Sequence, residues 1–113
     1  NQLKVGERFV FQAVSGLTGT VGVFNLVDKQ YQLVYTDKVL EINKQIQIPS
    51  ARYKMQAELP NGKIHSNELL VFLFTDKNLT FKSQYSTMEF DSLVKDIPFS
   101  NRKIINHHVS IER

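Results

Sequence analysis

Glu68-Leu-Leu-Val-Phe-Leu-Phe-Thr75 is the most apolar stretch of the chain, and the rest of the fold can be built outward from it. Six consecutive apolar residues between polar ones are typical of a β-strand that is covered on both faces. The run is far shorter than the roughly 20 apolar residues that span a bilayer. The sequence therefore predicts that this strand lies at the centre of the core.

Most of the remaining chain alternates between apolar and polar residues, most clearly at Tyr53, Met55, Ala57 and Leu59. Such alternation is typical of strands with one buried and one wet face. It predicts further strands at residues 7–14, 20–27, 31–36, 45–48, 79–82 and 103–111. Residue types that allow tight reversals predict turns at Ser15-Gly16, Asp28-Lys29, Asp37-Lys38 and Pro60-Asn61-Gly62.

One segment changes from the strand period to the helix period. A helix is predicted to begin at Ser86 and to end at Ile97. Ser86 and Glu89 have the spacing of a capping box, and Pro98 follows as a stop signal. The apolar residues between them recur at helical spacing, so the helix must cover part of the sheet system.

Seven to nine short strands and one helix predict a mainly β fold, specifically a two-sheet antiparallel sandwich of the Ig-like type. A barrel is the alternative. With 113 residues, of which 42% are hydrophobic, residues 1–113 are expected to form a single domain with one core. Because the chain starts at Asn1 instead of Met, it is expected to be excised from or processed out of a longer protein. Any membrane attachment would come from segments outside it.

Composition excludes several classes of function. The net charge of +3 comes from basic residues scattered singly along the chain, whereas nucleic-acid binders gather them on one face. No nucleic-acid partner is therefore expected. The absence of cysteine excludes disulfides, Cys-ligated zinc and thiolate nucleophiles.

The residues that could carry catalysis or bind a metal do not form a recognisable constellation. His107 and His108 are neighbours on a predicted strand and point to opposite faces, with His107 expected to be partly buried and His108 exposed. No nucleophile elbow and no glycine-rich phosphate loop is present. The sequence therefore predicts a protein that is not an enzyme and has no metal site, no catalytic residue and no cofactor.

Tyrosine is the residue type best suited to surface binding here, because a phenol can lie half exposed at a sheet edge or in a loop. The chain has four tyrosines, and all are candidate ligand-binding residues: Tyr31, Tyr35, Tyr53 and Tyr85. The eight phenylalanines mostly fall on the apolar phase of their strands and are assigned to the core.

Short motifs taken in order give the chain a resemblance to a known family. They include Leu3-Lys-Val-Gly-Glu7, Gly22-Val-Phe-Asn-Leu26, Tyr31-Gln-Leu-Val-Tyr35, Ile48-Pro49 and Leu59-Pro-Asn-Gly62. With the apolar run, the helix and the last strand, they resemble a bacterial family of β-sandwich domains of unknown function. Its members are attached to caspase-like peptidases, protein kinases and envelope lipoproteins. The family's Asn-rich stretch before Ile48-Pro49 is reduced here to Asn43.

The resemblance implies an accessory domain and supplies no catalytic residue. We expect a non-catalytic interaction module of a periplasmic or cell-envelope protein, which binds another protein through a sheet edge or loops. The alternative is a carbohydrate- or peptidoglycan-binding β-sandwich domain that uses the tyrosines.

Overall fold

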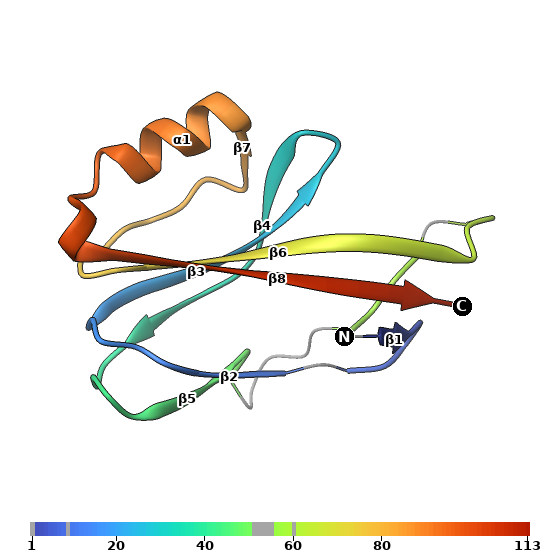
Figure 1. Ribbon diagram of the computed structural model, residues 1–113, viewed down its shortest axis with the longest axis horizontal. Coiled ribbons are helices and arrows are strands. Elements are labelled where there is room, and N and C mark those ends of the chain that lie inside the picture. The colour runs from blue at the N-terminus through green and yellow to red at the C-terminus, as the bar shows by residue number, and fades with distance from the viewer. Residues whose placement is uncertain (1, 9, 51–55, 60) are drawn as a thin grey trace.

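The computed structural model describes residues 2–8, 10–50, 56–59 and 61–113, and within them the fold is mainly β with one α-helix (Figure 1). This confirms the mainly β character that the alternation predicts. The elements follow the order β1 (Gln2–Lys4), β2 (Phe11–Val14), β3 (Gly19–Val27), β4 (Gln30–Val39), β5 (Gln45–Ile48), β6 (His65–Thr75), β7 (Gln84–Ser86), α1 (Thr87–Lys95), the 3-10 turn η1 (Phe99–Asn101) and β8 (Arg102–Glu112).

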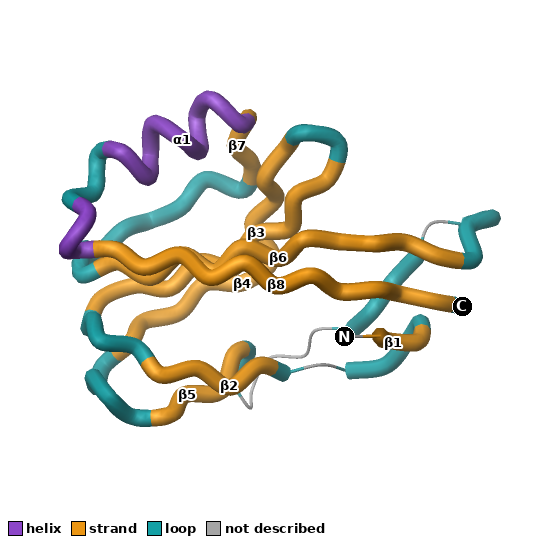
Figure 2. Tube along the Cα trace, in the orientation of Figure 1, coloured by secondary structure: helices purple, strands orange, loops and turns teal. Residues whose placement is uncertain are grey.

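The strands form two sheets, which Figure 2 shows in orange. The larger sheet has six strands in the order β1-β8-β6-β3-β4-β7, and the smaller one pairs β2 with β5. All pairs of strands are antiparallel except β1 and β8, which are parallel, so the large sheet is mixed where the sequence predicts an antiparallel one. Short hairpins enforce antiparallel pairing only between strands close in sequence, and β1 and β8 are the first and the last.

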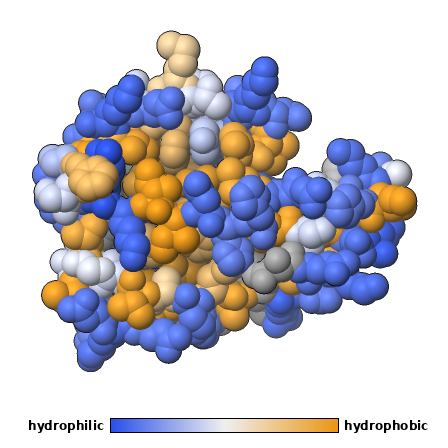
Figure 3. Space-filling model, in the orientation of Figure 1, coloured by the Kyte–Doolittle hydropathy of each residue, from blue (hydrophilic) through white to orange (hydrophobic). Residues whose placement is uncertain are grey.

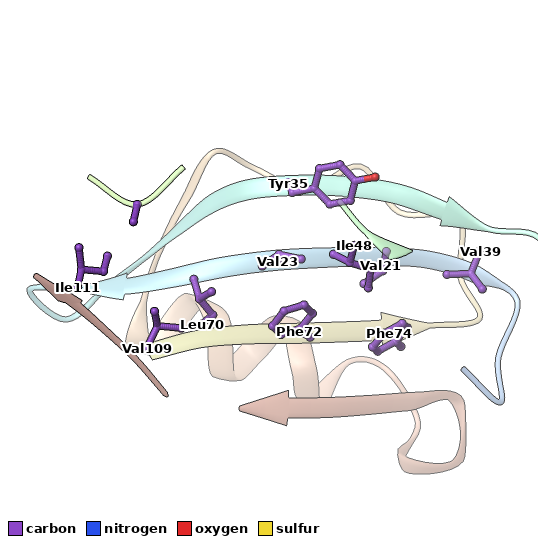
Figure 4. Close-up of a cluster of buried hydrophobic side chains, with 11 residues drawn as sticks. Val21, Val23, Tyr35, Val39, Ile48, Leu70, Phe72, Phe74, Val109 and Ile111 are labelled. Carbon is purple, nitrogen blue, oxygen red and sulfur yellow. The ribbon is translucent and has the colours of Figure 1, made fainter. Parts of the chain in front are cut away.

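The large sheet is covered on both faces, as its central strand requires. Leu70, Phe72 and Phe74 of β6 belong to a buried cluster that also includes Ile48 of β5 (Figure 4). Val71 and Leu73 point the other way and join a second cluster, the helix-side cluster, which includes the helix residue Phe90. The small sheet therefore covers one face and α1 the other, which confirms that the apolar run is a strand buried on both sides.

The helix begins where the capping box places it. Ser86 is the N-cap and accepts a hydrogen bond from the Glu89 amide, while the Glu89 side chain accepts one from the Ser86 amide. The helix ends at Lys95, two residues before the predicted end. Arg102 of β8 donates hydrogen bonds from Nη1 to the carbonyls of Val94 and Ile97, so a cation faces the carbonyl end of the helix. At nine residues, α1 is too short to span a membrane, and no other described helix could do so.

Glu89 should make the stability of the domain depend on pH. The Lys82 ammonium, 2.8 Å from Glu89 Oε2, and the bonds from Ser86 lower the pKa of Glu89 from 4.5 to about 2. A lowered pKa in the folded state gives stability that is present above pH 4.5 and lost as the pH falls towards 2. Urea unfolding of wild type and Glu89→Gln should therefore differ at pH 6.5 and converge near pH 2. An equal difference at both pH values would contradict this.

Several local predictions need correction. Asp37-Lys38 is no turn but lies inside β4, and residues 79–82 form a loop that inserts Leu79 and Phe81 into the helix-side cluster. At residues 7–14 only the second half is a strand, and residues 56–59 contribute an isolated bridge to Arg8. Residues 51–55 and Pro60 lie outside the described residues. The turn at Asp28-Lys29 is confirmed, with positive φ angles of 50° and 63°.

Candidate interaction surface

The predicted tyrosine site is not assembled on one surface. Tyr35 and Tyr85 are each only 7% exposed, and they lie in the two different clusters on opposite faces of the large sheet. Tyr31 stacks on Phe90 with ring centroids 4.0 Å apart and joins the helix-side cluster. Tyr53 lies outside the described residues. The prediction of half-exposed rings is wrong for Tyr35 and Tyr85, whose hydroxyls find partners inside the protein.

A cavity of about 340 Å³ opens beside Tyr35, between β4 and β5. Tyr35 Oη donates a hydrogen bond to Asp37 Oδ2 at 2.7 Å and accepts one from the Ser50 amide at 2.9 Å. Burial raises the pKa of Tyr35. Among the described residues, the lining combines exposed Leu40 with Asp37, Lys38 and apolar residues of the sheet interface, and includes no histidine, serine or cysteine. The described part of this lining therefore holds no nucleophile with an adjacent imidazole base.

The three histidines have different surroundings. His65 Nδ1 is 3.8 Å from Glu112 Oε1 across the surface of β6 and β8. His107 is half-buried and packs edge-to-face on Phe11 with the ring centroids 4.6 Å apart, and burial lowers its pKa. His108 is exposed on the opposite face, so the predicted orientations are confirmed. In the part of the chain that the structure describes, no three His, Cys, Asp or Glu residues are grouped to hold a metal ion.

No protein-family model, no curated protein and no solved structure matches the chain. The family resemblance therefore stays a prediction.

The feature that stands out is the outer edge of β8. The strand has 11 residues and is paired along its whole length with β6, but β1 covers its other side only at Ser110, Ile111 and Glu112. In Figure 1 the red ribbon of β8 runs along the front of the molecule, and β1 lies beside its C-terminal end. Among the described residues, no strand pairs with this edge between Arg102 and Val109.

The hydrogen-bonding direction of each β8 residue follows from the bonds at the ends of the strand. The Asn101 carbonyl accepts a hydrogen bond from the Asp76 amide at 3.2 Å, and the Arg113 amide donates one to the Ile64 carbonyl at 3.1 Å. The backbone N–H and C=O groups of odd-numbered residues therefore point towards β6. The Glu112 carbonyl accepts a hydrogen bond from the Val5 amide at 2.9 Å, so the backbone N–H and C=O groups of even-numbered residues point towards β1. Because the direction alternates along a strand, the N–H and C=O groups of Ile104 and Asn106 point outward. They have no backbone partner there among the described residues.

Exposed apolar and basic side chains flank these free groups. Ile104 is 40% exposed, and Phe99, just before β8, is 86% exposed with the Arg102 guanidinium 5.4 Å from its ring centroid. On the other face of the strand lies the exposed Lys103. Figure 3 shows hydrophobic residues among hydrophilic ones on the side of the molecule along which β8 runs. From Arg102 to Ile111 the sequence contains no acidic residue.

Two proline substitutions test the assignment of this edge. The side chains of Lys103 and Asn106 are both exposed, but the backbone N–H of Lys103 points towards β6, where Lys103 is paired with the buried Phe74. Lys103→Pro removes an N–H that donates a hydrogen bond to β6, whereas Asn106→Pro removes an N–H that faces solvent. Lys103→Pro should therefore lower the free energy of unfolding by about 1–3 kcal/mol more than Asn106→Pro. Urea unfolding of the two variants measures the difference. Equal losses would show that the edge is assigned to the wrong residues.

Proposed function

We propose that this domain is a non-catalytic interaction module that binds an extended segment of another protein along the outer edge of β8. The observation that carries the proposal is the outward-facing backbone of Ile104 and Asn106, next to exposed Ile104 and Phe99 side chains. A segment that adds to such an edge gains main-chain hydrogen bonds, and nearby side chains provide specificity.

The expected binding energy indicates which contacts matter. Ile104 and Asn106 each offer one donor and one acceptor, and each hydrogen bond contributes a net ~0.5–1.5 kcal/mol. Association costs at least ~4 kcal/mol in lost translational and rotational freedom. The hydrogen bonds would therefore align the segment, and burial of Ile104 and Phe99 would have to supply much of the net affinity.

We further propose that the two sheets form a β-sandwich of the Ig-like kind. We also propose that the chain is an accessory domain of a bacterial cell-envelope protein. The buried cluster between the β2–β5 sheet and the large sheet supports the sandwich. The envelope location rests on the family resemblance, and fractionation of cells that express the parent protein tests it. The carbohydrate-binding alternative has less support, because a sugar cannot stack on rings as buried as those of Tyr35 and Tyr85.

The function is tested by selecting binders from a displayed library of random linear 12-residue peptides. We expect selected peptides to bind wild type and to lose at least tenfold in affinity for Asn106→Pro, because the proline removes an outward donor and its ring blocks pairing. Ser92→Ala on the exposed face of α1 is the control and should bind as wild type does. A selection that yields no peptide, or only peptides indifferent to Asn106→Pro, would refute the proposal.

A further inference from the structure

We infer that the segment bound at β8 is acidic on one face and apolar on the other, with acidic residues opposite Lys103 and apolar residues opposite Ile104. This inference rests on the function proposed above and specifies its partner. It follows from the alternation of side chains along the free part of the edge.

The two faces of the edge differ in chemistry. Lys103 lies on the face that carries the β2–β5 sheet, together with Ile105, which packs against the cluster between the sheets. Ile104 lies on the helix face, where Arg102 extends over Phe99 and to the end of α1. A strand paired with β8 places its own side chains alternately on the same two faces. One set of its residues therefore meets an ammonium group, and the other meets exposed apolar surface.

Charge selects an acidic segment over a basic one. Lys103 forms no ion pair with any described residue, and the strand has no acidic residue before Glu112. Opposite charges directly across two strands stabilise the pair, and like charges destabilise it. The Arg102 guanidinium is held by the carbonyls at the end of α1, so Lys103 is the cation available for pairing on this part of the edge.

The same charge argues against a second copy of the chain as the occupant. Two β8 edges paired about a two-fold axis would bring Arg102 and Lys103 of one copy towards Arg102, Lys103, His107 or His108 of the other. The side chains facing one another would all be neutral or basic. A lysine on an edge strand is a common device that prevents such self-pairing.

The test compares three synthetic nine-residue peptides by titration calorimetry or fluorescence anisotropy. The first alternates Glu with Val, the second alternates Lys with Val, and the third has the composition of the first but with its Glu and Val residues in two blocks. We expect the Glu-Val peptide to bind at least tenfold more tightly than the other two and to weaken as salt is raised. Asn106→Pro should abolish its binding.

Charge reversal at the edge gives the matched control. Lys103→Glu should weaken the Glu-Val peptide roughly three- to tenfold and strengthen the Lys-Val peptide. Lys63→Glu makes the same charge change in the exposed loop before β6 and should leave both affinities within about twofold of wild type.

The outcomes separate this inference from the proposed function. If uncharged or basic peptides bind as tightly and still depend on Asn106, the acidic inference is wrong and the edge function stands. If no peptide shows binding that Asn106→Pro removes, and the library also yields none, both are wrong. If sedimentation shows a dimer of the free domain that Asn106→Pro dissociates, the occupant is a second copy and the inference is overturned.

Discussion

Phe24→Ala should lower the free energy of unfolding by about 3–5 kcal/mol, which is a large fraction of the stability of an ordinary small domain. Phe24 of β3 is fully buried. Three rings surround it edge-on, with centroid distances of 5.3 Å to Phe81, 5.9 Å to Tyr85 and 5.0 Å to Phe90. Truncation removes all three ring contacts and opens a cavity between the large sheet and α1. Thermal or urea unfolding monitored by circular dichroism measures the loss.

Phe99→Ala is the matched control for this prediction. It removes the same atoms from a residue that is 86% exposed and contacts the Arg102 guanidinium. Its effect on the free energy of unfolding should stay within about 1 kcal/mol. If the two substitutions destabilise the domain equally, the helix-side cluster is not the core that the structure describes.

Gly19→Ala should destabilise the domain by about 2–6 kcal/mol, because the added methyl group has no room and the backbone is unfavourable for any other residue. A Cβ at Gly19 would lie 2.1 Å from the Thr75 carbonyl oxygen and 2.8 Å from Asp76 Cα. These are main-chain atoms at the end of β6, so β3 would have to move away from β6 to relieve the clash. The φ angle of Gly19 is also positive, at 151°.

Gly16→Ala provides the comparison. A Cβ there would meet no atom within 4 Å, and the residue lies in the connection between β2 and β3, three residues before Gly19. Gly16→Ala should therefore change stability by no more than about 1 kcal/mol. Similar unfolding midpoints for the two variants would contradict the close approach of the β3 start to the β6 end.

The spacing of apolar residues predicted an element correctly where the tertiary structure buries those residues in the same kind of element. The run from Leu69 to Phe74 is a strand buried on both faces, and Ser86 with Glu89 starts the helix, because both signals are contained within a few neighbouring residues. Residues 79–82 alternate like a strand yet form a loop. Phe81 is buried and Leu79 partly buried in the helix-side cluster without strand pairing, so packing against that cluster accounts for the alternation.

Sequence reasoning missed the candidate interaction surface for a different reason. Lys103 and Ile104 fit an ordinary strand, and Phe99 follows Pro98 without a motif that would mark it. Exposure of Phe99 depends on the short η1 turn between α1 and β8, which was not predicted. Amphipathic chemistry favours the tyrosines as binding residues, but the hydroxyls of Tyr35 and Tyr85 form hydrogen bonds inside the fold with Asp37, Ser50 and Lys82.

The sequence by itself determined the mainly β character, the central strand, the single helix and the lack of cysteine chemistry, because each depends on residue type or on spacing within one segment. Only the tertiary structure decided that β8 lies near the edge of the large sheet and that β1 covers just its last residues. The neighbours of β8 are set by pairing with segments distant in sequence, such as Gln2 of β1 opposite Ser110, and no local pattern encodes which backbone groups those contacts leave free.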